Sequence, residues 1–376
     1  MFKKFKVSIS FLIMTVFLII NPITALAAEN TAAAMDLDTV MKNTVSSNSA
    51  LSLYDKKIET ATAAEEDATN DPGDETDYQT EMRLSVNPQR RQLELDNLNW
   101  EKDQKQDSVT TDSKQYYYGY LIQEELIKIQ QSKIERLKKV LENKKLGIDV
   151  GTEAQTSLID DQVNLDTAEV GLEQLSNDKE SLRMKLNINM GKDVDTAINL
   201  KSEDIPYEEY TVEDIGALAK NMSEEYHSIT SLNRELELDK VEKGIAEIYD
   251  DDKNQLERAG SPNTDYKSYA ETLGDDITNL EYAVIDEQNA INAKVRTDYN
   301  NLLNLNNTVL SKKLDYDQAQ ILYNSEKAKF SVGMSTKLSC DAAEENMKAA
   351  TCEYNKAKLD YLVSVEQFKS YVKDFI

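Results

Sequence analysis

The residue types that most often carry enzyme chemistry are few in this chain. His227 is the single histidine, and Cys340 and Cys352 are the only cysteines. A lone histidine on an expected helix has no second ligand for a metal and no nucleophile to activate. The sequence contains no Ser/His/Asp set, no clustered Cys/His ligands and no phosphate-binding glycine loop. It therefore predicts a protein that is not an enzyme and that takes no cofactor and no metal.

The two cysteines lie twelve residues apart on one expected helix. At about 1.5 Å rise per residue they are roughly 18 Å apart, too far for a disulfide within that helix. Cys340 falls in an apolar seam, so we expect a small buried side chain at this position. A disulfide between subunits or a metal ligand is the alternative role for these thiols.

The elements that carry these residues come from one stretch that occurs twice, at about 117–186 and 299–368. A shift of 182 residues superimposes the copies without a gap and places Val150-Gly151 on Val332-Gly333. In each copy, apolar residues recur at alternating spacings of three and four, the pattern of a helix packed along another helix. Each copy is therefore expected to be a helical hairpin that reverses at the Val-Gly pair.

The repeat is larger than the hairpin. A shorter helix expected at 37–70 has its counterpart at about 212–250, with Val40 matching Ile215 at a shift of 175. Only 5 prolines and 11 glycines occur in the chain, which suits very long helices. We predict an all-α fold of long antiparallel coiled-coil helical hairpins, arranged as two tandem structural repeats.

The predicted organisation has four parts: a signal peptide at 1–27, a first repeat at 28–195 with its tip near 147–153, a connector at 196–210, and a second repeat at 211–376 with its tip near 330–336. The basic start MFKKFK, the apolar run that follows and Ala25-Leu26-Ala27 predict cleavage after Ala27. An uncleaved membrane anchor is the alternative. Either outcome places the rest of the chain outside the cytoplasm.

Two polar connectors are expected between the shorter and the long helix of each half, at 72–88 and 259–274. Neither is long enough for a pair of membrane-spanning strands. The formal net charge of -26 disfavours nucleic acid and anionic membrane surfaces as partners. A tyrosine cluster at 116–120 is expected to pack in a helical core, and a ligand platform is the alternative.

The chain resembles the TolC-like outer membrane efflux proteins in three segments: LDTVMKNTVSSNSAL, KLGIDVGTEAQTSLIDDQVNLDTAEVGLEQL and KFSVGMSTKLSCDAAEENMKAATCEYNKAKLDYLVSVEQF. In that family three chains form a tube of helical hairpins capped by a β-barrel in the outer membrane. The hairpin tips meet an adaptor that is tied to an inner-membrane pump. The resemblance implies a homotrimer whose adaptor-docking tips are Val150, Gly151, Thr152, Val332, Gly333 and Met334.

The chain departs from the family pattern in two respects. The barrel strands of the family have no counterpart in the sequence, so we expect a TolC-like α-barrel protomer without an evident β-barrel. Ser339 and Ala342 occupy the positions where the family carries gate aspartates. The candidates for pore-facing acids are then Asp160, Asp161, Asp341, Glu344 and Glu345. Such a protein suits an envelope with no outer membrane, as in Gram-positive bacteria, and an outer-membrane location requires a barrel.

The predicted function is that of a TolC-like efflux or export duct of the cell envelope. Its expected partners are two further copies of the chain, a periplasmic-adaptor-type (membrane fusion) protein and an inner-membrane transporter. Apolar positions such as Leu359, Leu362 and Val365 are expected to be covered by association between copies. One alternative is a non-transporting structural or adhesive coiled-coil protein of the envelope. A second is an acidic adaptor, although adaptors usually carry β-rich domains, which this sequence lacks.

Overall fold

The computed structural model describes residues 34–70, 78–251 and 265–376. These residues form nine helices and no strand, apart from one isolated bridge between Met35 and Leu200. The predicted all-α fold of long helical hairpins is confirmed. The predicted signal peptide at 1–27 and parts of both expected connectors lie outside the described residues.

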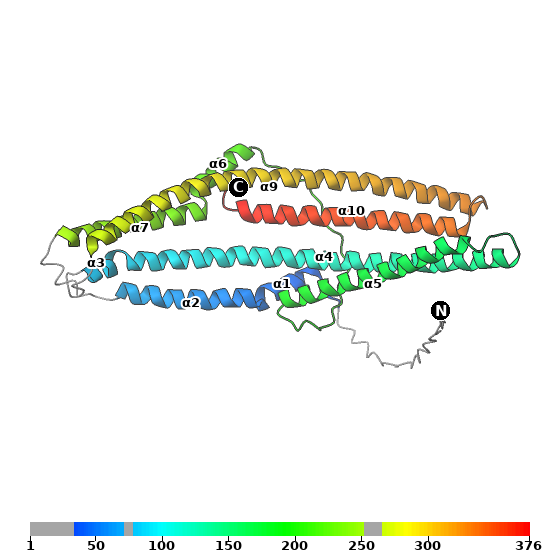
Figure 1. Ribbon diagram of the computed structural model, residues 1–376, viewed down its shortest axis with the longest axis horizontal. Coiled ribbons are helices and arrows are strands. Elements are labelled where there is room, and N and C mark those ends of the chain that lie inside the picture. Colours follow the sequence, from blue (N-terminus) through cyan, green and yellow to red (C-terminus); the bar gives the residue numbers. More distant parts are fainter. Residues whose placement is uncertain (1–33, 71–77, 252–264) are drawn as a thin grey trace, which may run out of the picture. The chain divides into compact units, whose positions relative to one another are not determined.

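The described helices repeat in the same order in the two halves of the chain (Figure 1). The first half contains α1 (Leu37–Ser47), α2 (Ser49–Asn70), α3 (Tyr78–Ser85), α4 (Asn87–Asp149) and α5 (Ser157–Asn189). The second half contains α6 (Ile215–Glu225), α7 (His227–Asp251), α9 (Tyr266–Ser331) and α10 (Lys337–Val372). The longest helices are α4, with 63 residues, and α9, with 66. Each is therefore about 95–100 Å long.

The shorter helix of each half is in fact two helices, and its predicted register is wrong. The side chain of Asp36 caps α1 by accepting from the Thr39 amide, and Asp214 caps α6 in the same way from the Ala217 amide. The two caps lie 178 residues apart, not 175. Val40 therefore matches Leu218, and both side chains are buried. The cap sets the register because it ends the extended segment and satisfies the first free amides of the helix.

The described part of the first connector is also different from the prediction. Residues expected to form a polar loop fold into α3, because Tyr78 and Met82 lie one turn apart and bury their side chains against α4 and α7. In the second connector, Asp265 caps α9 through the Ser268 amide, so the long helix begins at Tyr266. Local capping and a small apolar contact extend both helical segments into stretches that are polar in sequence.

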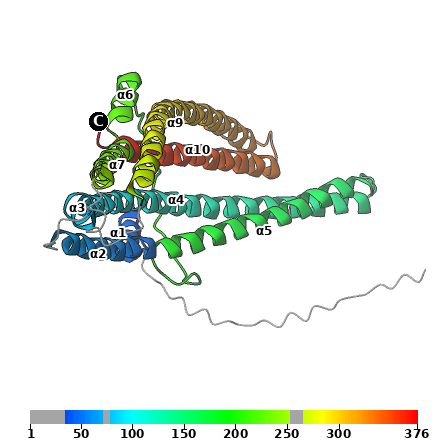
Figure 2. The same ribbon diagram turned by 60° about the vertical axis from the view of Figure 1, so that its left-hand side comes forward.

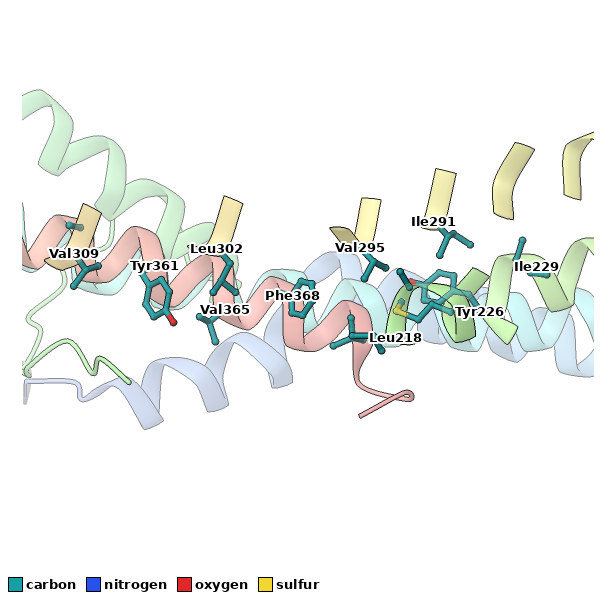
Figure 3. Packing of buried hydrophobic residues seen from close by; sticks show 14 residues of the cluster. Leu218, Tyr226, Ile229, Ile291, Val295, Leu302, Val309, Tyr361, Val365 and Phe368 are labelled. Atoms are coloured by element: carbon teal, nitrogen blue, oxygen red, sulfur yellow. The ribbon is translucent and has the colours of Figure 1, made fainter. Parts of the chain in front are cut away.

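The long helices lie side by side in one layer (Figures 1 and 2). Toward the hairpin turns the order is α5, α4, α10 and α9, and in the other half of the layer it is α2, α4, α7 and α9. The largest core lies between α9 and α10, where Val295, Leu302 and Val309 meet Val365 and Phe368 (Figure 3). Because α4 and α9 run through both halves of the layer, they join the two sets of shorter helices.

The connector between the repeats is held against the first hairpin. The Arg183 guanidinium donates to the carbonyls of Val194 and Thr196, both at 2.6 Å. The Tyr117 hydroxyl donates to the Lys201 carbonyl at 2.7 Å, next to the bridge at Leu200. Tyr117 is fully buried with Tyr118 and Tyr120 in a core that contains Val40 and Leu186, which confirms packing as the role of the tyrosine cluster.

Three helices end in the same glycine motif. The described residues with positive φ are Gly151 at 78°, Gly191 at 64° and Gly333 at 75°. Each glycine amide donates to the carbonyl three residues earlier, and the next amide donates to the carbonyl five residues before it. This pattern ends a helix in the left-handed conformation, which glycine adopts without steric cost. At Gly191 the chain also passes close to α1, since a Cβ there would lie 2.1 Å from the Ser47 carbonyl oxygen.

The variant Gly191→Ala is expected to lose at least about 2 kcal/mol of unfolding free energy, because a non-glycine residue is strained at positive φ and its methyl group meets the Ser47 carbonyl. Chemical denaturation followed by circular dichroism measures the change. The matched control is Gly244→Ala in α7, where nothing lies within 4 Å of the added methyl. That variant is expected to gain roughly 0.5–1 kcal/mol from helix propensity. Equal effects of the two changes would contradict the close approach at Gly191.

Candidate functional site

The turns of the two hairpins lie at the same end of the layer (Figures 1 and 2) and carry exposed apolar side chains. Val150 is 74% exposed in the first turn, and Val332 and Met334 are 69% and 78% exposed in the second. Nothing lies within 4 Å of a Cβ built on Gly151 or Gly333. These glycines are therefore required only by their positive φ, and the turns themselves remain open for contact.

The two turns differ in tightness although they have equal length in the alignment. In the second turn, the Thr336 hydroxyl accepts from the Ser339 amide at 3.1 Å, and α10 starts at Lys337. The residue at the equivalent position of the first turn is Ala154, which has no side-chain acceptor. Without that cap α5 starts only at Ser157, after a short stretch of i to i−3 bonds.

Four of the five candidate pore-facing acids form ion pairs inside the chain. Asp161 lies 2.5 Å from Lys144, Asp341 lies 2.5 Å from Lys337, Glu344 lies 2.8 Å from Lys348, and Glu345 pairs with Arg136. The fifth, Asp160, is exposed on the first turn of α5. A pore-facing role for these acids stays a prediction, and Asp160 is the member most open to solvent.

The Arg136–Glu345 pair joins the first hairpin to the second. The Arg136 Nε donates to both carboxylate oxygens at 3.0 and 2.9 Å, and Nη2 donates to Oε2 at 2.8 Å. The two side chains are only 19% and 11% exposed. They line a charged groove of about 300 Å³ between α4 and α10, together with Lys128, Ser132 and Lys139. Two-point binding of this kind fixes the relative rotation of the two helices.

The outer side of α5 carries an apolar stripe against which none of the described helices packs. Ile159, Val163, Val170 and Ile188 are each more than half exposed. Their spacings of four, seven and eighteen residues place them on one side of a helix. The opposite side of α5, with Leu165 and Ala168, is buried against α4.

The outer side of α9 carries a second stripe of the same kind. Ile285, Leu303 and Ile321 follow one another at intervals of eighteen residues, which is five full turns, and all three are exposed. Leu310 and Leu314 lie between the last two and are 47% and 69% exposed. The α5 stripe and the α9 stripe therefore mark the two opposite edges of the layer (Figure 1).

The repeat relates these stripes to a contact already made inside the chain. Val163 and Val170 correspond, at a shift of 182, to Glu345 and Cys352, which α10 turns toward α4. On the other edge, Leu310, Leu314 and Ile321 correspond to Lys128, Ser132 and Lys139 of α4, which line the groove beside α10. Each stripe thus carries the repeat counterparts of residues that lie at the α4–α10 contact.

The apolar positions expected to need a partner chain were wrongly identified from the sequence. Leu359 and Val365 are buried, and Leu362 packs against the core around Tyr117. Both α4 and α9 lie beside α10, so an apolar residue on either of these sides of α10 is covered within the chain. The eighteen-residue spacing of Ile285, Leu303 and Ile321 was the sequence signal for the exposed stripe.

The histidine and the cysteines take structural positions. His227 stacks on Trp100 with ring centroids 4.7 Å apart, and its Nε2 lies 2.9 Å from the Asn97 side-chain oxygen. Cys340 is buried, as the seam predicts, and Cys352 is buried as well; burial raises the pKa of the Cys352 thiol to about 11. In the described part of the chain, no three His, Cys, Asp or Glu side chains gather in a way that suits a metal ion.

A polar cluster at the far end of the layer was not anticipated. Glu242 is buried and accepts hydrogen bonds from Tyr78 at 3.1 Å and Tyr269 at 2.5 Å. Arg90 bridges Glu242 and Asp239 at 2.7 and 2.6 Å. Burial raises the pKa of the Asp239 carboxyl. The cluster ties α3, α4, α7 and α9 together, and no sequence motif indicates it because its members lie far apart in the chain.

Comparison with known proteins gives matches at the level of structure only. No family model matches the sequence, and no curated protein matches it. The solved outer-membrane channel OprN is 13% identical, with a TM-score of 0.64, and the match covers 89% of each chain. The CmeC outer membrane channel of Campylobacter jejuni is 13% identical, with a TM-score of 0.60, over 89% of this chain and 85% of that one. The outer membrane protein VceC of Vibrio cholerae is 11% identical, with a TM-score of 0.61, over 89% and 95%.

The protein therefore has the helical fold of the TolC-like outer membrane efflux channels, and the resemblance seen in the sequence is confirmed as a likeness of fold. At these identities the match defines the architecture and leaves activity to be argued from the chain itself. None of the helices in the described residues is both long enough and apolar enough to span a bilayer.

The variant Glu345→Gln is expected to lower the unfolding free energy by about 1–3 kcal/mol, because it leaves the Arg136 guanidinium half-buried without its counter-charge. Chemical denaturation measures the loss, and hydrogen exchange is expected to speed up at the facing stretches of α4 and α10. Glu344→Gln is the matched control, since the Lys348–Glu344 pair is more exposed and is expected to contribute less than about 0.5 kcal/mol. An equal loss in both variants would contradict a locking role for Arg136–Glu345.

The contact between Trp100 and His227 is expected to weaken in mild acid. Burial lowers the pKa of His227 from its ordinary 6.5, so the folded chain binds this proton less readily than the unfolded chain. The stabilisation is therefore full above pH 6.5 and declines as pH falls toward the lowered value. Unfolding followed by the fluorescence of Trp100, the only tryptophan, measures it. His227→Gln is expected to lose this part of the pH dependence; an unchanged profile would contradict the assignment.

Proposed function

We propose that the protein is a duct component for efflux or export in the cell envelope and that three copies close into a ring of helices. The observation that carries the proposal is the pair of unlike edges. At the shift of 182 residues, the α5 stripe corresponds to the side of α10 that faces α4, and the α9 stripe corresponds to the side of α4 that faces α10. The two stripes are therefore the counterparts of two surfaces that already meet inside the chain. An interface between unlike surfaces joins each copy to the next and closes into a ring when the rotation per copy permits.

The number three rests on the likeness of fold to the TolC-like channels. Three chains with two hairpins each supply six hairpins, and each long helix then has a neighbour on both sides. OprN and the CmeC protein of Campylobacter jejuni, which share this fold, are outer membrane channels. A duct of the cell envelope is therefore the function that the fold and the open edges support best.

The hairpin turns are the proposed docking site for a partner. Val150, Val332 and Met334 present apolar side chains to solvent at one end of the layer, and the positive-φ glycines Gly151 and Gly333 hold the turns. Exposed apolar groups at a tip are suited to the helical end of an adaptor of the membrane fusion type. An inner-membrane transporter is the proposed pump, and the protein acts without catalysis of its own.

Cross-linking through one cysteine pair tests the ring directly. The Arg136–Glu345 contact has its repeat equivalents at Gln318 and Val163. In a ring, Val163 of one copy therefore lies opposite Gln318 of the next. A Val163→Cys/Gln318→Cys variant, built on Cys340→Ala/Cys352→Ala, is expected to give a ladder that ends at the trimer with a short bis-maleimide. Each single variant is expected to give none of these products.

A second variant separates assembly from folding. Leu310→Glu/Leu314→Glu places charges on the exposed α9 stripe and is expected to abolish trimers while leaving the helical circular dichroism unchanged. Ile248→Glu, a similarly exposed position on α7, is the control and is expected to assemble normally. Light scattering after gel filtration measures the mass. Monomers for the unmodified chain at micromolar concentration, with export intact in its absence, would favour the structural coiled-coil alternative.

A further inference from the structure

The edge formed by α2 carries a basic groove in a strongly acidic chain. Two adjoining hollows of about 550 and 580 Å³ lie between α2 and the α3–α4 segment. Lys56, Lys57 and Arg91 line the first hollow; Glu94 is the acidic side chain among the described residues that line it, and it pairs with Arg91 at 2.9 Å. The floor is apolar, with Ala61 and Leu98. The full chain has 69 acidic and 43 basic residues and a formal net charge of -26.

The repeat shows how α2 differs from its counterpart α7. At the shift of 178 defined by the caps, Ala61 and Ala64 of α2 correspond to Asp239 and Glu242 of α7. In the second half those two carboxylates fill the space beside α4 and pair with Arg90. Ala61 and Ala64 therefore supply no carboxylate at the corresponding positions of α2.

The internal contact of α7 with α4 shows what the α2 edge is shaped to meet. Lys56 corresponds to Arg234, whose Nη1 lies 2.5 Å from an oxygen of Asp96 on α4. In the layer, α7 lies between α4 and α9. By the repeat, α2 in the proposed ring lies between its own α4 and the α9 of the next copy. The α9 position equivalent to Asp96 is Thr278, at a shift of 182. Lys56 is thus expected to face the neighbour's α9 near Thr278.

The stretch of α9 around Thr278 carries the complementary charge. Asp275 and Glu281 stand three residues on either side of it, and Glu271 lies further along the same helix; all three are exposed. No ion pair joins these carboxylates to a basic side chain in the described residues. Glu281 lies one turn before Ile285, so it extends the α9 stripe toward the end of the layer remote from the turns.

We infer that Lys56 and Lys57 at the α2 edge form an electrostatic latch with Asp275 and Glu281 on the α9 of a neighbouring copy. The inference rests on the proposed ring and describes the part of its interface that lies remote from the turns. Near the turns the edges meet through apolar stripes, and at the remote end they meet through opposite charges above an apolar floor. Charges at the rim of an interface act mainly on the rate and register of association, and they weaken as salt screens them.

Charge reversal on each side tests the latch. Lys56→Glu/Lys57→Glu is expected to weaken trimer formation at least about tenfold at 50 mM salt, because like charges then face each other. Asp275→Lys/Glu281→Lys is expected to weaken it similarly. The chain that carries all four substitutions is expected to recover assembly to within about threefold of the original. At 500 mM salt the differences are expected to shrink. Native mass spectrometry over a concentration series measures the trimer fraction.

The control for total charge is Lys133→Glu/Lys145→Glu, two exposed lysines of α4 outside the groove. It changes the net charge equally and is expected to assemble like the original chain. If the reversals at α2 and α9 leave assembly unchanged while the Val163/Gln318 cross-link still forms, the latch is wrong and the ring stands. If neither cross-link nor trimer forms in any variant, both proposals fall. Weakening by Lys56→Glu/Lys57→Glu without rescue, together with inhibition of assembly by inorganic phosphate, would make the groove a site for a free anion and overturn the latch.

Discussion

A long helix that lies within a single layer must be covered on two opposite sides, and this requirement governs the molecule. The helices α4 and α10 meet it, because each lies between two others in the half of the layer nearer the turns. The helices α5 and α9 meet it on one side only and leave Val170 and Leu314 in water. In the proposed ring, the neighbour that each edge lacks is the other edge of the next copy.

The repeat uses different chemistry for the contact inside the chain and for its counterpart at the edges. Inside, Arg136 and Glu345 form a half-buried ion pair, whereas the equivalent edge positions carry Gln318 and Val163. Two hairpins of one chain are already tethered, so a contact that fixes rotation at a cost in desolvation is tolerable there. An interface between chains must also offset the lost freedom of the free subunits. Burying apolar side chains at the edge contributes more directly to the free energy of association.

The sequence was informative wherever a local rule decides the structure. The Val-Gly pairs marked the turns because only glycine adopts positive φ easily, and the spacings of three and four marked the helices. The register of α1 and α6 escaped notice because it depends on Asp36 and Asp214 as caps, which an alignment of apolar residues overlooks. The assignment of Leu359 to an intermolecular surface failed for a different reason. Periodicity shows that a side of a helix is apolar but does not show which neighbour covers it.

The bridge between Met35 and Leu200 has a consequence for the order in which the chain takes its shape. Residues near the start of the described chain are fastened to the connector by two backbone hydrogen bonds of 2.9 Å, from Met35 to Asn199 and from Lys201 to Met35. Because the chain is synthesised from its N-terminus, these two hydrogen bonds can form only after about 165 further residues have been added. By that time the whole first hairpin is available, while the second is still to come. The bridge therefore closes the first repeat as a finished unit, onto which α9 and α10 are added later.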